Sequence, residues 1–244
     1  MILVLFAAAA AAVAPPSADQ TRYDNCVALI RNSAPNAVVA AQGWRIEGGG
    51  ILARQCEGMA FAAQAKWLEA ATAFENGATL AASQANPRAA DLWQQAGNAA
   101  LAANDAGRAV KALDAALATG VLGGEDAGEA HLDRGRAQAA LGHATEARSD
   151  LDAAKTLVPA DPLVWLLSAT LARRANDLPR ALDDIQQAMK LASDDASVAL
   201  EGGNIAMASG KTDAARTAWE AAVKLQPGSS AAKAAAENLA QLGK

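Results

Sequence analysis

Small and large apolar residues recur at fixed offsets along most of this chain. In each occurrence an alanine is followed four positions later by a large apolar residue, and three positions after that by a second small residue. The leading alanines are Ala70, Ala109, Ala147, Ala181 and Ala215, so that the steps between them are 39, 38, 34 and 34 residues by subtraction. Such offsets are typical of one face of an α-helix. A period in this range indicates stacked helical units rather than one globular core.

Helix-breaking residues divide each unit into two expected helices. The predicted turns are Gln64-Ala65-Lys66, Asn104-Asp105, Gly142-His143, Asn176-Asp177 and Gly210-Lys211. Two steps exceed 34 residues, and the additional residues fall across positions 84–87 and 120–124. We interpret each as a tolerated loop insertion or a lengthened helix end, with a functional hinge as the alternative.

From Ile51 onward the units resemble the tetratricopeptide repeat (TPR), a helix-turn-helix unit of about 34 residues. The five successive matches are Gly58 and Phe61 with Ala70, Phe74 and Gly77; Trp93 and Gly97 with Ala109, Leu113 and Ala116; Gly135 with Ala147, Leu151, Ala154 and Pro159; Trp165 and Ala169 with Ala181, Ile185 and Ala188; and Gly203 with Ala215, Trp219, Ala222 and Pro227. The resemblance covers roughly residues 51–226. It implies an all-α protein, a right-handed α-solenoid of about five TPR-like repeats.

The segments that flank the repeats are expected to cap the stack. We predict an N-terminal helical cap over residues 19–50, five repeats over 51–227 and a C-terminal capping helix over 228–244. Within the first cap, Asn32-Ser33-Ala34-Pro35 is expected to separate two helices. Terminal units of a solenoid differ from the others because their outer faces meet water.

The first 14 residues are apolar throughout and are followed by Pro15, Pro16 and Ser17. We interpret residues 1–18 as a signal peptide, which predicts a periplasmic protein of the bacterial cell envelope, with secretion or an uncleaved N-terminal anchor as alternatives. No cysteine follows the apolar run directly, which argues against a lipid-anchored bacterial protein.

Cys26 and Cys56 are the two cysteines of the chain. An even number of cysteines in an exported protein predicts one disulfide, which would tie the N-terminal cap to the first repeat. The alternative is two buried free thiols in a cytosolic protein.

Composition and motifs argue against several functions. The formal net charge of −5 and a pI of about 5.1 disfavour nucleic-acid binding, which requires a clustered basic face. His131 and His143 do not have metal-ligand spacing, and we interpret both as structural. Carboxylates on the expected second helices are interpreted as solvated surface charges rather than acid/base pairs: Asp150, Asp152, Asp183 and Asp184. We therefore expect no enzyme activity, cofactor, metal or small-molecule substrate.

The resemblance implies a binding surface instead. In TPR proteins the first helix of each repeat lines a concave groove, and projecting that arrangement selects Gln94, Asn98, Asp133, Arg136, Thr170, Arg173, Glu201, Asn204 and Met207. Amide side chains can donate to and accept from a peptide backbone, and Arg136 or Arg173 could pair with a carboxylate. The alternative for these residues is plain solvated helix surface. TPR chaperone adapters grip a terminal carboxylate with lysines, but the corresponding positions here are Gln, Asp and Leu.

We therefore expect a non-enzymatic scaffold or adapter that binds a protein or peptide partner, as an extended peptide or a helix, in its concave groove. The alternative function is a structural subunit of a larger envelope complex, in which the groove is unused.

Overall fold

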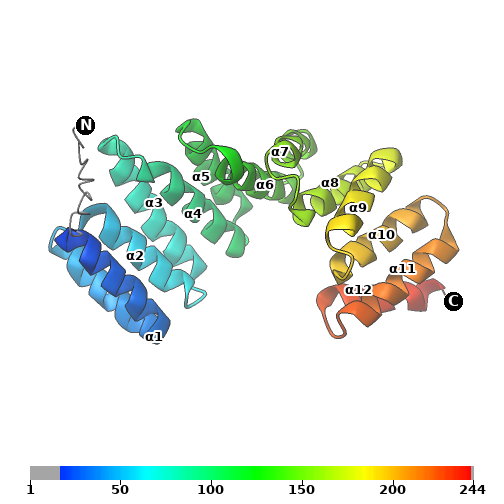
Figure 1. Ribbon diagram of the computed structural model, residues 1–244, viewed down its shortest axis with the longest axis horizontal. Helices are drawn as coiled ribbons and strands as arrows, with labels where there is room; N and C mark the ends of the chain where they lie inside the picture. The colour runs from blue at the N-terminus through cyan, green and yellow to red at the C-terminus, as the bar shows by residue number, and fades with distance from the viewer. Residues whose placement is uncertain (1–16, 243–244) are drawn as a thin grey trace, which may run out of the picture.

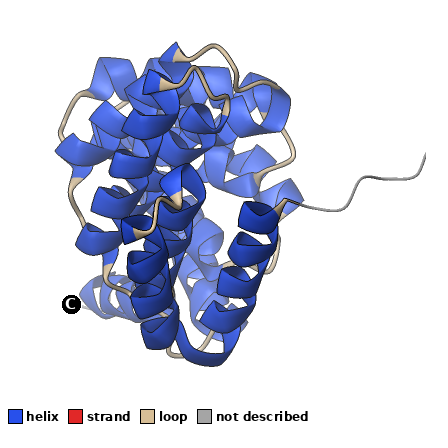
Figure 2. Ribbon diagram, turned by 90° about the vertical axis from the view of Figure 1, so that its left-hand side faces the viewer, coloured by secondary structure: helices blue, strands red, loops and turns tan. Residues whose placement is uncertain are grey.

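The computed structural model describes residues 17–242, and within them all regular secondary structure is helical (Figure 2). The helices are α1 (Ala18–Ile46), α2 (Gly50–Ala62), α3 (Trp67–Ser83), α4 (Arg88–Ala102), α5 (Ala106–Ala118), α6 (Gly124–Ala140), α7 (Ala144–Leu157), α8 (Pro162–Arg174), α9 (Leu178–Leu191), α10 (Ala196–Ala208), α11 (Thr212–Leu225) and α12 (Ser230–Leu242). They form an α-solenoid, which confirms the predicted fold class. The predicted signal peptide lies outside the described residues except for Ser17, which caps α1, and Ala18.

Helix α1 folds back on itself and forms a helical hairpin. Ser33 leaves the helical conformation, with φ of −159° and ψ of 89°, two residues before Pro35. Arg22 lies over the ring of Trp44, 5.5 Å from its centroid, so the segments before and after Ser33 run side by side. The prediction that the sequence breaks a helix at residues 32–35 is therefore confirmed.

A disulfide joins α1 to α2. Cys26 and Cys56 are bonded, their Cα atoms are 6.3 Å apart, and both side chains are buried. The bond closes a loop of 30 residues. In the chain-entropy description a loop of this size stabilises the folded state by about 3–4 kcal/mol.

Left-handed residues form the turn between the two helices of each unit. Asn104 and Asn176 both have φ of 59°, Ala65 has φ of 55°, and Gly142 and Gly210 have φ of 82° and 73°. All five lie within the predicted breaks. Glycine and asparagine adopt this conformation readily, whereas it strains an alanine.

The longer steps in the repeat are explained by helix length as well as by loops. Helices α3 and α6 each have 17 residues, whereas α5 has 13. The first insertion therefore includes a lengthened helix end, and the second combines a loop over residues 119–123 with a longer α6.

Close approach of paired helices explains the alternation of small and large residues. A Cβ atom added to Gly97 in α4 would lie 2.5 Å from Cγ of Leu113 in α5. Likewise, a Cβ atom on Gly58 in α2 would lie 2.6 Å from the ring of Phe74 in α3. Such distances leave no room for a methyl group, so glycine at these positions lets the large partner fill the space between the helices.

The stack curves because its first helices lie closer together than its second helices. Helices α4, α6, α8 and α10 contact one another from unit to unit. Second helices are connected by long side chains, as where Arg108 of α5 binds Glu75 of α3, with 2.7 Å from Nε to Oε1. Figure 1 shows the resulting arch, which runs from α1 through α7 to α12. The first helices accordingly line its inner side.

Candidate functional site

All nine residues predicted to bind a partner lie on first helices of the arch. They are placed as follows: Gln94 and Asn98 on α4, Asp133 and Arg136 on α6, Thr170 and Arg173 on α8, and Glu201, Asn204 and Met207 on α10. The structure brings them together in local groups rather than in one continuous site.

The largest of these groups is a buried polar network near the C-terminal end. Arg173 donates two hydrogen bonds to Glu201, with 2.6 Å from Nε to Oε1 and 3.2 Å from Nη2 to Oε2. Glu201 is only 6% exposed and also accepts a bond from Nδ2 of Asn204 at 3.1 Å. Oδ1 of Asn204 accepts bonds from Trp219 and Asn238, both at 3.1 Å. The network therefore joins α8, α10, α11 and α12.

Because of these bonds, the C-terminal group has a structural role in the free protein. The guanidinium of Arg173 already has a carboxylate partner, so a ligand carboxylate would have to compete with Glu201. Beside the network is a hollow of about 410 Å³, lined in part by Met207, Trp219 and Leu242. The amides of Asn204, Asn238 and Gln241 also line this hollow, and its apolar part could hold an apolar side chain of a partner.

A second group lies on α6 and α8. Asp133 accepts a hydrogen bond from Arg136, with 3.0 Å from Nη1 to Oδ1. Burial raises the pKa of Asp133 above its usual value, and Arg136 opposes part of that shift. Arg136 and Thr170 line a hollow of about 250 Å³ whose apolar wall includes Leu151 and Leu167. Arg136 is exposed, so it remains accessible at the rim.

The two residues on α4 stand apart from both groups. Asn98 is exposed on the inner side. Nε2 of Gln94 is 3.5 Å from the backbone oxygen of Asp126 in α6, which makes a long hydrogen bond across the units. Asn98 is thus more exposed than Gln94 and Asn204, which are both half-buried.

The interpretation of the second-helix carboxylates as solvated is wrong for Asp150. This side chain on α7 is 4% exposed. It accepts hydrogen bonds from Arg134 at 2.9 Å and 2.6 Å, and Nδ1 of His131 lies 2.9 Å from its Oδ1. The side chains of His131 and Arg134 extend from α6 to α7 and cover the carboxylate of Asp150. His131 is thus a structural residue, as predicted.

The same interpretation is wrong for Asp184 on α9, which is 5% exposed. Nζ of Lys155 on α7 lies 3.2 Å from its Oδ1. Asp152, at 47% side-chain exposure, binds both Lys155 and Arg180. Burial works to raise the pKa of Asp152, but the hydrogen bonds from Arg180 and Lys155 outweigh it and lower the pKa. These ion pairs connect α7 to α9 on the outer side of the arch.

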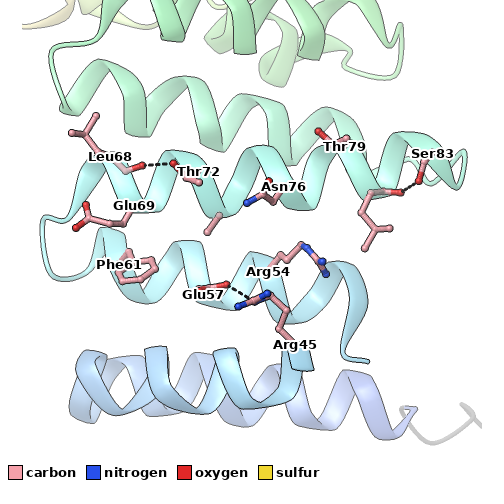
Figure 3. A pocket seen from close by; sticks show the side chains of 12 residues that line it. Arg45, Arg54, Glu57, Phe61, Leu68, Glu69, Thr72, Asn76, Thr79 and Ser83 are labelled. Atoms are coloured by element: carbon pink, nitrogen blue, oxygen red, sulfur yellow. Dashed lines mark hydrogen bonds and ion pairs between the residues drawn. The ribbon is translucent and has the colours of Figure 1, made fainter. Parts of the chain in front are cut away.

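A hollow larger than the two on the inner face lies elsewhere, along α3. We define the α3 groove by its lining residues: Arg45, Arg54, Glu57, Phe61, Leu68, Glu69, Thr72, Ala73, Asn76, Thr79, Leu80 and Ser83. Its volume is about 790 Å³. Figure 3 shows that α3 forms one wall, that α2 contributes Phe61, Glu57 and Arg54, and that Arg45 reaches in from α1.

Sequence reasoning missed the α3 groove because it considered first helices only. One signal was present in the sequence. Thr72, Asn76, Thr79 and Ser83 recur at helical spacing on one face of α3, and none of them is charged. All four side chains are exposed.

Two negative results concern residues 17–242. None of their helices has both the length and the apolar character needed to cross a lipid bilayer. Over the same residues, no group of three or more His, Cys, Asp or Glu side chains is arranged to hold a metal ion.

Comparison with known proteins identifies the fold. Neither a protein-family model nor a curated protein sequence matches the chain. PilW, described as a widely conserved type IV pilus biogenesis factor, matches with a TM-score of 0.72 and 17% identity, over 94% of this chain and 100% of PilW. PilF of Pseudomonas aeruginosa matches with a TM-score of 0.71 and 16% identity, over 92% and 100% of the two chains. YrrB, described as a TPR protein with an unusual peptide-binding site, matches with a TM-score of 0.61 and 16% identity, over 80% and 96%. The fold is thus that of TPR proteins, as the sequence resemblance predicted.

Proposed function

We propose that this protein is a non-enzymatic interaction scaffold that holds a peptide or helix of a partner protein on the inner face of its arch. The observation that carries the proposal is the curvature of the stack, which gathers exposed polar side chains and apolar hollows on one face. Asn98 and Gln94 supply amides that can bind a peptide backbone, and Arg136 supplies a cation beside the hollow that Thr170 helps to line. TPR-fold proteins are typically interaction scaffolds, which agrees with this function.

We place this function in the bacterial cell envelope. The disulfide between Cys26 and Cys56 favours an oxidising compartment. The apolar leader predicted over residues 1–18 would direct export. PilW, a pilus biogenesis factor by description, shares the fold and agrees with such a location. For the organisation of the chain, we propose five repeats over residues 51–227 between helical caps at 19–50 and 228–244.

A structural subunit of a larger envelope complex is the second candidate, and two observations favour it. Part of the inner face is already used, because Arg173, Glu201 and Asn204 bond to one another. Val39 and Ile46 of α1 are 70% and 81% exposed, so the N-terminal hairpin presents apolar side chains to solvent. A subunit of this kind should self-associate when it is produced alone, whereas a scaffold with a free inner face should remain monomeric.

Site-specific photo-crosslinking in the producing cell tests the proposal. A photoreactive residue at Asn98 or Arg136 should give discrete adducts with a partner protein. The same residue at Ser149, which is exposed on the outer side of α7, is the matched control and should give none. Adducts of equal yield from all three positions, or from Ser149 alone, would contradict inner-face binding. Fusion of the leader to a phosphatase that folds only after export tests the location.

A further inference from the structure

The outer face of α3 differs in charge from the other second helices of the arch. On its stretch from Thr72 to Ser83 every exposed side chain is uncharged, and Glu75 on an adjacent face is half-buried and paired with Arg108. Over its whole length α3 carries one exposed charged residue, Glu69, whereas each of the corresponding helices α5, α7, α9 and α11 carries at least two, as with Lys111 and Asp114 on α5. Depletion of charge is characteristic of the core of a protein interface rather than of solvated surface.

The α3 groove has the dimensions of a helix-binding site. From Leu68 to Ser83 its wall spans 15 residue steps, which corresponds to about 22 Å of α-helix at about 1.5 Å per residue. Leu68 is 53% exposed, and Phe61 and Leu80 are half-buried along the floor. The hollow of about 790 Å³ is therefore long, open and partly apolar.

The side chains of the groove favour a helix over an extended peptide. The hydroxyl of Thr72 donates to the backbone oxygen of Leu68 at 2.9 Å, and that of Ser83 donates to the backbone oxygen of Leu80 at 2.7 Å. An extended peptide would bring a full row of unpaired backbone groups into the groove, and on the α3 wall the amide of Asn76 and the hydroxyl of Thr79 would have to pair with all of them. A helix satisfies its own backbone and presents only side chains, which suits a smooth, uncharged wall.

Charged residues of opposite sign lie at different places along the groove. Glu69 lies at the end where Phe61 and Leu68 are found, and Arg45 and Arg54 lie near the middle, opposite the stretch from Asn76 to Thr79 (Figure 3). Within residues 17–242, the carboxylate of Glu69 has no hydrogen-bond or ion-pair partner. Arg54 donates only to the backbone oxygen of Gly50, at 2.9 Å. One carboxylate at the Leu68 end and one guanidinium near the middle of the groove thus lack a charged partner.

We propose that the α3 groove binds an amphipathic α-helix of a partner protein. The helix packs its uncharged face on Thr72, Asn76 and Thr79, places a basic residue against Glu69, and places an acidic residue against Arg54. This site is separate from the inner face, so the arch has two binding surfaces and can bring two protein segments together. The inference does not depend on what binds at Asn98 or Arg136.

Photo-crosslinking from the groove tests the inference in the full chain, in the producing cell. A photoreactive residue at Asn76 or Thr79 should form an adduct, and mass spectrometry should map it to a segment with helical apolar periodicity that carries a basic residue at one end and an acidic residue nearer its middle. The residue Gln186, exposed on the corresponding second helix α9, provides the control position and should give no such adduct. Absence of an adduct from both groove positions, an adduct with a second copy of this chain, or an adduct with a segment that lacks this pattern would overturn the inference.

Charge reversal separates groove binding from a general loss of function. Glu69→Lys should lower the adduct yield from Asn76 by about fivefold or more, because a favourable pair becomes a repulsive one. The same change at Glu146, exposed on α7, is the control and should leave the yield unchanged. Reversing the basic residue of the mapped partner segment should restore the yield with Glu69→Lys. Inner-face adducts from Arg136 should persist in every variant, so failure at the groove is distinguishable from failure of the scaffold function. Equal yields from wild type and Glu69→Lys would contradict the proposed orientation of the helix.

Discussion

Two neighbouring glycines of α10 allow a direct test of the packing that builds the arch. A Cβ atom on Gly203 would overlap Cδ1 and Nε1 of Trp219 and lie 3.0 Å from its Cγ. At Gly202 the nearest atoms, Cγ1 of Ile185 and Sδ of Met189, would be 3.9 Å away, which is ordinary contact. The same substitution by alanine should therefore have opposite effects at adjacent positions.

The expected magnitudes follow from three contributions. Replacing a helical glycine by alanine stabilises a helix by about 0.5–1 kcal/mol when there is space, which is the whole effect expected for Gly202→Ala. For Gly203→Ala, overpacking against Trp219 costs about 1–3 kcal/mol. Displacing the indole also breaks its hydrogen bond to Asn204, at about 1 kcal/mol. After subtracting the helix gain, we expect Gly203→Ala to destabilise the fold by about 1–3 kcal/mol.

Urea denaturation monitored by circular dichroism measures the two effects, and hydrogen exchange localises them. Because units of a solenoid can unfold separately, protection of the amides in α10 and α11 is the sharper readout. Gly203→Ala should reduce protection there, and Gly202→Ala should keep or raise it. If both variants shift stability in the same direction, close approach of Gly203 to Trp219 is not what determines this contact.

Three further predictions concern the disulfide, a buried ion pair and the protonation of a carboxyl group. Cys26→Ser, or reduction of the bond to Cys56, should lower the free energy of unfolding of the N-terminal units by about 3–4 kcal/mol, measured by urea denaturation with and without reductant; an unchanged midpoint would contradict a stabilising disulfide. Arg134→Met should destabilise the fold by about 3–5 kcal/mol, because it leaves Asp150 buried without its main partner. The double variant with Asp150→Leu should recover much of this loss, measured by thermal unfolding. A double variant no more stable than Arg134→Met would argue against a cost of the unpaired carboxylate. Burial and the surrounding carboxylates raise the pKa of Glu129, so the folded protein binds the proton of Glu129 more strongly than the unfolded chain does. The free energy of unfolding should therefore rise as the pH falls from about 7 through the pKa of Glu129 in the folded state. Glu129→Gln should remove that part of the pH dependence of the melting temperature, and an identical pH profile would show that folding does not raise the pKa of Glu129.

Much of the fold could be predicted because each unit is specified locally. The spacing of Ala109, Leu113 and Ala116 identifies one face of α5, and Asn104 marks the turn before it through its tolerance of the left-handed conformation. The helix break near Ser33 was predictable for the same reason, because Pro35 restricts the residue before it and lacks an amide hydrogen.

The candidate sites were less predictable because they depend on neighbouring units. The resemblance to TPR proteins placed Asn204 and Arg173 on the inner side of the arch, but it gave no sign that Glu201, Trp219 and Asn238 would bind them. The burial of Asp150 was also missed, because it results from Arg134 crossing from one helix to the next.

The helices, their turns and the stacking of repeated units follow from the amino-acid pattern, since they depend on contacts between residues close together in the chain. Which polar side chains remain accessible depends instead on how the units pack, and packing also creates the α3 groove between α1, α2 and α3. The physical reason is that burial, ion pairing and hollow surfaces arise from the distance and angle between packed helices. Those distances and angles are set by the shapes of side chains from several units at once.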